Sequence, residues 1–171
     1  MSRRLARETA LQVMFQVEVT RIDSTEAIDY TCEEFKVPEP SREFVRRLVN
    51  GTLANLAEID RAIQSVAKDW MLERMAKVDR NILRLAGFEL LFCPDIPGNV
   101  SVNEAIELTK VYSGEESGKF VNGILGALLV KTNAEQEKST NQSLQTAGES
   151  AAQAEAPPDS ETETVPEGKF E

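Results

Sequence analysis

Apolar side chains recur every three or four residues along most of this chain, which is the period of one helical face. The pattern predicts helices over residues 3–19, 24–35 and 41–66, a helical turn at 70–75, and further helices from residues 79, 101 and 113. No stretch alternates apolar and polar residues for long enough to predict a strand. The sequence therefore predicts an all-α protein of about seven helices.

The helix expected from Asp79 is the most apolar part of the chain and reads N-I-L-R-L-A-G-F-E-L-L-F over residues 81–92. A helix that is apolar on nearly every side is buried, so we expect it at the centre of the fold. We expect Asp79 to cap this helix, and Ser41 to cap the helix over residues 41–66, with a kink near Asn50-Gly51.

Two further helix starts are predicted between residues 99 and 130. Ser101 is followed three residues later by Glu104, and Ser113 by Glu116. Each pair can form a capping box, in which the two side chains satisfy backbone N–H groups of the first turn.

The last of these helices carries an apolar stripe together with two glycines. The stripe consists of Phe120, Ile124, Ala127 and Leu128. Gly123 and Gly126 each weaken a helix by about 1 kcal/mol relative to alanine. We therefore expect another backbone to approach the helix closely at these glycines.

The composition of the chain changes near residue 133. Residues 1–133 contain 17 Lys and Arg against 20 Asp and Glu, a net charge of −3. Residues 134–171 contain 2 Lys and 9 acidic residues, a net charge of −7, and few large apolar side chains. The sequence predicts a helical domain over 1–133 and a disordered acidic tail over 134–171. The tail either solvates the protein or mimics nucleic acid, and the sequence does not choose between these roles.

Several classes of function are disfavoured. The chain contains no histidine, and Cys32 and Cys93 lie far apart, so we expect core thiols in a reducing cytoplasm and neither a metal site nor a cofactor. The segment 114–120 differs from a phosphate-binding loop in length, in its last residue and in context. No segment approaches the ~18 apolar residues of a membrane span. We predict a binding protein rather than an enzyme.

The start of the first helix has the chemistry of a site for single-stranded RNA. Arg3, Arg4 and Arg7 precede Phe15, which lies on the same side of the predicted helix as Arg4. Guanidinium groups bind phosphates, and an aromatic ring stacks on an unpaired base. A solvated arginine cluster beside a core phenylalanine remains the alternative.

The motifs N-E-A-I-E-L at 103–108 and K-F-V-N-G-I-L at 119–125 closely resemble the NusB family of bacterial transcription antitermination factors, and the resemblance covers about residues 1–131. It implies two packed helical subdomains and binding of single-stranded boxA RNA. The RNA-binding residues that it implies are Arg3, Arg4, Arg7, Phe15, Trp70, Glu116, Lys119 and Phe120. Leu5 stands where the family often has a further arginine, so the basic patch is thinner here.

The resemblance also implies a protein partner, the small ribosomal protein that acts as NusE. The matching contact residues lie on the central helix and are Asp79, Arg80 and Arg84. The expected function is transcription antitermination within an RNA polymerase complex, in support of ribosomal RNA synthesis. An interaction module or homodimer with little RNA affinity is the alternative, favoured by the thin patch and the acidic tail.

Overall fold

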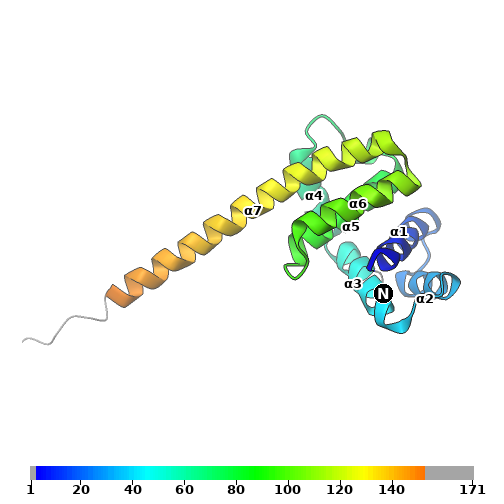
Figure 1. The fold of residues 1–171 in the computed structure, drawn as a ribbon, viewed down its shortest axis with the longest axis horizontal. Helices are drawn as coiled ribbons and strands as arrows, with labels where there is room; N and C mark the ends of the chain where they lie inside the picture. Colours follow the sequence, from blue (N-terminus) through cyan, green and yellow to red (C-terminus); the bar gives the residue numbers. More distant parts are fainter. Residues whose placement is uncertain (1–2, 153–171) are drawn as a thin grey trace, which may run out of the picture. The chain divides into compact units, whose positions relative to one another are not determined.

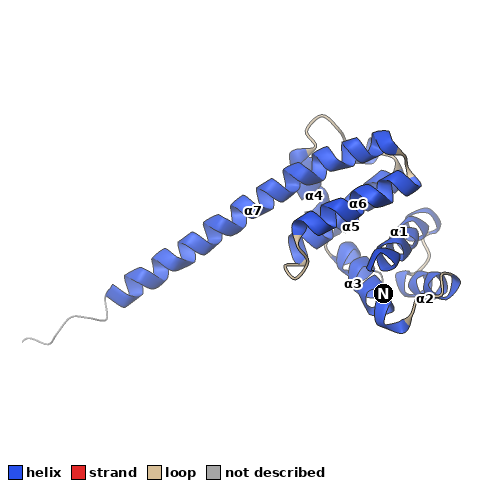
Figure 2. Cartoon of the chain, viewed as in Figure 1, coloured by secondary structure: helices blue, strands red, loops and turns tan. Residues whose placement is uncertain are grey.

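A computed structural model describes the backbone of residues 3–152 and the side chains of residues 3–144. This part of the chain contains seven α-helices and one 3-10 helix, and no strand (Figures 1 and 2). The helices are α1 (Arg3–Thr20), α2 (Ser24–Glu34), α3 (Glu39–Ala54), α4 (Leu56–Val66), the 3-10 helix η1 (Leu72–Arg74), α5 (Lys77–Phe92), α6 (Gly98–Tyr112) and α7 (Glu115–Ala152). The all-α prediction is confirmed.

The chain divides into two units, Met1–Ala134 and Glu135–Glu171. Within the first unit, α1, α2 and α3 pack on one another, and α5 packs on α4 and α6. Helix α5 also contacts α1 and α3, so it joins the two helical groups (Figure 1). The central position predicted for this helix is confirmed.

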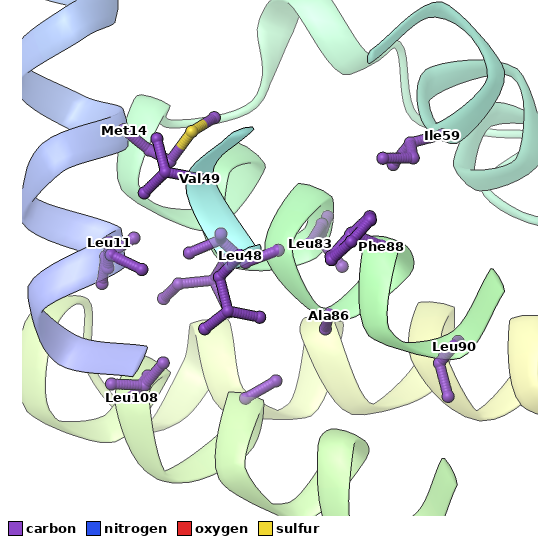
Figure 3. Close-up of a cluster of buried hydrophobic side chains, with 14 of the residues drawn as sticks. Leu11, Met14, Leu48, Val49, Ile59, Leu83, Ala86, Phe88, Leu90 and Leu108 are labelled. Carbon is purple, nitrogen blue, oxygen red and sulfur yellow. The ribbon is translucent and has the colours of Figure 1, made fainter. Parts of the chain in front are cut away.

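The core is formed where α1, α3 and α5 meet. Leu11 and Met14 of α1 lie beside Leu48 of α3 and Leu83 of α5, and all four are buried (Figure 3). Burial of each such side chain contributes about 1.5–3 kcal/mol to folding. Both cysteines are buried free thiols, as expected for core residues.

Helix starts follow prolines more often than the sequence pattern predicted. Asp23 caps α2, because its carboxylate accepts hydrogen bonds from the backbone N–H groups of Thr25 and Glu26. The predictions for Ser41 and Asp79 were wrong, because α3 begins at Glu39 and α5 at Lys77. Proline fixes φ near the helical value and needs no donor in the first turn, so a Pro-rich segment starts α3 earlier than a serine cap would.

Neither predicted capping box defines a helix start. Helix α6 begins at Gly98 after Pro97, so Ser101 lies inside the helix. Ser113 is the C-cap residue of α6, and α7 begins at Glu115. The turn between the two helices passes through Gly114, whose φ of +112° is open to glycine but strained for other residues.

The predicted helix over 41–66 is two helices, and the break lies at Asn55 rather than at Asn50-Gly51. The Asn55 side chain donates to the Gly51 carbonyl at 2.8 Å, and the Asn55 backbone N–H donates to the same carbonyl at 3.2 Å, so both groups close the end of α3. Gly51 has another role, because a Cβ atom placed there would lie 2.1 Å from the Phe88 ring of α5. The lack of a side chain at Gly51 leaves the space that the Phe88 ring occupies, and we call this space the Gly51 notch.

The first part of α7 buries most of the predicted stripe, since Ile124 and Leu128 are buried and Phe120 packs against the core. Val121, Ile124, Leu125 and Leu128 are buried, whereas Ala127 is exposed. A Cβ atom added at Gly123 or Gly126 meets nothing within 4 Å, so the expected close backbone approach at these glycines was wrong.

Helix α7 continues to Ala152, and this differs from the disordered tail predicted over 134–171. Residues 135–144 are exposed, as their composition predicted, yet they are helical. Extending an existing helix fixes one residue for each new hydrogen bond, so it needs no buried face. The remainder of the predicted tail, residues 153–171, lies outside the described residues.

We expect Gly51→Ala to lower the free energy of unfolding by about 1–3 kcal/mol, because the buried Phe88 ring must move. Urea unfolding measures this change. The matched control Gly123→Ala, in open space on α7, should raise stability by about 0.5–1 kcal/mol. If the cost at Gly51 is unchanged when Phe88 is replaced by leucine, the notch is not its cause.

Candidate nucleic-acid interface

The start of α1 presents two arginines beside α3 and α6. The Arg3 guanidinium lies over the Phe44 ring of α3, 4.8 Å from its centroid, and makes no ion pair with any described residue. Arg4 donates from Nε and Nη2 to the two carboxylate oxygens of Glu104 on α6, at 3.0 and 2.9 Å. This contact lowers the pKa of Glu104. Both predicted residues therefore lie on the surface, but Arg4 already has an anionic partner.

Arg7 has a different environment, because it is only 5% exposed. Its Nε and Nη2 atoms donate to the Glu89 carboxylate of α5 at 2.7 and 2.8 Å, and the Ser101 hydroxyl of α6 donates to the same carboxylate at 2.6 Å. Burial alone would lower the pKa of Arg7, but the bonds to Glu89 outweigh it and raise the pKa. Arg7 thus holds the start of α1 against α5 and α6, away from the exposed surface.

Helix α3 contributes a third arginine to this surface, and the sequence did not predict it as an RNA-binding residue. Arg47 donates to the Asp95 carboxylate at 2.8 and 2.5 Å, one helical turn from Phe44. This contact lowers the pKa of Asp95 to about 2. Phe44 and Arg47 are three residues apart on one predicted helix, and this spacing was the available signal. We call Arg3, Arg4 and Arg47 the arginine surface.

Three other predicted RNA-binding residues line a single pocket of about 650 Å³. Trp70 is 59% exposed and meets Phe120 of α7 edge to face, with ring centroids 5.2 Å apart. Glu116 lines the same pocket and pairs with Lys119 at 3.3 Å. We call this the aromatic pocket, which is lined by Asp69, Trp70, Met71, Arg74, Met75, Ala76, Asp79, Glu116, Ser117 and Phe120.

The structure does not bring all predicted residues together. Phe15 of α1 is 37% exposed, and no ring or cation contact to the other predicted residues is found for it within residues 3–144. Leu11, one helical turn before Phe15, is buried in the core. Of the predicted RNA-binding residues, Arg3 and Arg4 lie in the arginine surface, and Trp70, Glu116 and Phe120 line the aromatic pocket, with Lys119 paired to Glu116. Arg7 is buried, and Phe15 makes no ring or cation contact with either group in the part of the chain that the structure describes.

The predicted partner residues on α5 have separate environments. Asp79 lines the aromatic pocket. Arg80 forms an ion pair with Glu18, and Arg84 donates to the Asp60 carboxylate at 2.8 Å through two nitrogens. Burial opposes ionisation of Glu18, but bonds from Asn81 and Arg80 lower its pKa. Arg84 also lines a mainly apolar pocket of about 500 Å³, with Met14, Val17, Ile22, Leu53 and Leu56.

Within the described part of the chain, no group of three or more metal-binding side chains is found. The same part contains no helix with the length and apolar character needed to cross a membrane.

A sequence model of the NusB family matches residues 4–130. The chain belongs to the NusB family. The transcription antitermination protein NusB of Pelotomaculum thermopropionicum is 58% identical over 129 residues, which cover 75% of this chain and 90% of that protein. The NusB of Desulfitobacterium hafniense strain DCB-2 is 53% identical over 140 residues, covering 81% and 95% of the two chains.

Solved NusB structures have the same fold. T. maritima NusB superposes with a TM-score of 0.70 at 41% identity, covering 75% of this chain and 91% of that one. A second match is a crystal structure of the antitermination factors NusB and NusE in complex with dsRNA, with a TM-score of 0.70, 30% identity, and coverage of 75% and 96%. These matches confirm the resemblance to the NusB family, the all-α fold, and the prediction of a binding protein rather than an enzyme.

We expect Arg7→Met to lower the free energy of unfolding by about 3–5 kcal/mol, because it leaves the Glu89 charge buried without its cation. Arg4→Met is the matched control, since it breaks an exposed pair on the same helix and should change stability little. Chemical denaturation of both variants measures the difference. Equal effects would show that burial of the Arg7 pair is unimportant.

The Asp95 carboxyl group should titrate near pH 2 when followed by NMR. Because its pKa is lowered on folding, the pair with Arg47 stabilises the folded state above the ordinary value of 3.8, and that stabilisation is lost as pH falls through 2. Arg47→Gln should return the pKa toward 3.8, whereas Glu104 should keep its lowered pKa through Arg4. An unchanged Asp95 pKa in the variant would contradict this assignment.

Proposed function

We propose that this chain is a transcription antitermination factor that binds boxA-like single-stranded RNA together with NusE. The observation that carries the proposal is the arginine surface, where Arg3 has no carboxylate partner among the described residues and lies over an aromatic ring. The relatives named as transcription antitermination proteins, and the solved complex of NusB with NusE and dsRNA, support the same function.

Phosphate groups of the RNA would replace carboxylates at this surface. Arg4 and Arg47 have side chains that are 52% and 38% exposed, and both are paired with surface carboxylates. Exposed ion pairs are weak because water screens them, so a phosphate can displace Glu104 or Asp95 at small cost. The Arg7 pair with Glu89 is not displaced in this way, and in our proposal Arg7 positions α1 instead of contacting RNA.

NusE would bind at the second predicted site, on α5. Arg84 borders the mainly apolar pocket near Met14 and Leu53, which offers apolar contact beside the charged groups Glu18, Arg80 and Asp60. An RNA held by both proteins is bound more tightly than by either alone, because the first contact raises the effective concentration for the second. The assembly would act with RNA polymerase in the cytoplasm, during transcription of ribosomal RNA operons.

An interaction module or homodimer with little RNA affinity is the second candidate. The observation that favours it is the pairing of the cations: Arg7 is buried, and Arg4 and Lys119 are held by Glu104 and Glu116. If the chain is such a module, replacing Glu104 or Glu116 by glutamine would not create RNA affinity.

RNA titration followed by fluorescence anisotropy, with and without NusE, tests the proposal. Arg3→Ala combined with Arg4→Ala should weaken binding of a boxA-like strand at least tenfold, about 1.4 kcal/mol. Each lost phosphate contact should also reduce the slope of log K against log salt concentration by about 0.7. Glu104→Gln should strengthen binding, because Arg4 then faces the phosphate without a competitor.

Arg61→Ala is the matched control, since it removes one exposed arginine from α4, outside the arginine surface. Its affinity should change much less than that of the α1 variant. The proposal fails if the Arg3 and Arg4 substitutions leave both the affinity and the salt slope unchanged. A concentration-dependent increase in mass, together with unchanged RNA binding, would instead favour the homodimer.

A further inference from the structure

The Trp70 and Phe120 rings form a wall between two pockets. On one side is the aromatic pocket, and on the other is a pocket of about 430 Å³ that both rings also line. The second pocket is bordered by the exposed cations Lys68 and Lys119, and it shares the carboxylate of Asp69 with the first pocket. The two sides of one aromatic wall therefore carry different chemistry.

The aromatic pocket is rich in hydrogen-bond acceptors. It contains the carboxylates of Asp69, Asp79 and Glu116 against the single guanidinium of Arg74. Its volume of about 650 Å³ lies within the usual range for small-ligand sites. The sequence-based reading placed two of these residues near RNA or a partner but did not predict that they share a pocket.

Asp79 is the unusual member of this pocket. It is only 7% exposed, and its Oδ1 atom has no hydrogen-bond partner within the described structure. Buried polar atoms are nearly always paired, because leaving one unpaired costs the full price of its desolvation. Rotation about χ2 exchanges the two carboxylate oxygens readily, so either can face a ligand. A ligand that donates hydrogen bonds in this pocket would therefore satisfy the Asp79 carboxylate.

Guanine is the nucleobase whose edge fits a carboxylate. Its N1–H and N2–H groups are adjacent donors, and an ionised carboxylate offers two acceptors and no donor. Adenine and cytosine present one amino group next to a ring nitrogen acceptor, which the carboxylate repels. Uracil presents one N–H between two carbonyl oxygens, so it matches only one of the two acceptors.

We propose that the aromatic pocket binds one unpaired guanine of the RNA and that Asp79 is the residue that specifies it. The base lies beside Trp70 and Phe120 and donates from N1 and N2 to the Asp79 carboxylate. The attached phosphates lie toward Lys68 and Lys119 on the other side of the wall. This inference rests on the proposed RNA-binding function and adds a base preference to it.

A basic side chain of a protein is the competing occupant, since it also suits an acidic pocket with aromatic walls. The two lysines disfavour it, because they would repel a cationic partner and attract the phosphates of a nucleotide. The arrangement of acceptors on one side and cations on the other matches a nucleotide better than a lysine or arginine.

Replacement of one guanosine by inosine tests the proposal, because inosine lacks the N2 amino group and keeps the rest of the edge. The full chain is titrated, with NusE present, against uridine-rich single strands that contain one guanosine or one inosine. The wild type should bind the guanosine strand about tenfold more tightly. Asp79→Asn should abolish this preference, because the amide has one acceptor and its NH₂ group faces a donor.

Glu73→Gln is the matched control, since it neutralises an exposed carboxylate of the neighbouring η1 that does not line the pocket, and it should keep the guanosine preference. Lys119→Gln should weaken both strands equally and also keep the preference. Thermal unfolding of Asp79→Asn checks that this isosteric variant folds; if it does not, the wild-type comparison of guanosine with inosine still decides.

The outcomes separate this inference from the proposed function. Equal wild-type affinity for the two strands, with RNA still bound, overturns the guanine pocket and leaves the proposed function intact. Absence of RNA binding overturns both. If Asp79→Asn weakens NusE binding while the guanosine preference persists, the pocket holds a basic side chain of the partner and the inference is wrong.

Discussion

The buried contact between Arg7 and Glu89 is the constraint on which the surface chemistry depends. Both side chains are almost fully buried, and the Ser101 hydroxyl completes the carboxylate's hydrogen bonding. Two charges placed in an apolar interior are tolerated only with good geometry and further hydrogen bonds, so this contact specifies one arrangement of α1, α5 and α6. Arg3 and Arg4 lie within one turn of it, and their placement follows from that arrangement.

The surface cations show how a chain with a net negative charge can still bind RNA. The helical domain does not carry an unscreened positive field, since Arg4 and Arg47 are each paired with a carboxylate. In the function that we propose, RNA binding exchanges a carboxylate for a phosphate at these two arginines. Such an exchange favours a strand whose phosphates match the spacing of the arginines, and it disfavours loose attraction to any polyanion.

The sequence predicted features that depend on neighbouring residues better than features that depend on residues far apart in the chain. Helical periodicity predicted the all-α fold and the central position of α5, because periodicity reflects local geometry. The cap residues were harder, since a proline before a helix competes with a serine or aspartate inside it, as at Ser41 and Ser101.

The sequence suggested candidate residues for the site but could not predict their environments. Nothing local indicates that Arg7 is buried, because its partner Glu89 lies 82 residues away in sequence. The same holds for Asp79, whose pocket brings together η1, α5 and α7. Phe44 and Arg47 were missed because a helix face in α3 becomes part of the arginine surface only after α1 packs on it.

The Gly51 notch links packing to charge. The Phe88 ring fills the space of an absent methyl group, so α3 cannot slide along α5 without expelling the ring. Arg47 precedes Gly51 by one helical turn, and a shift of α3 would carry the guanidinium away from Asp95. The absence of a Cβ atom at Gly51 thus fixes the position of the Arg47 guanidinium on the surface. A larger residue at position 51 would displace Arg47 from Asp95 without contacting either side chain.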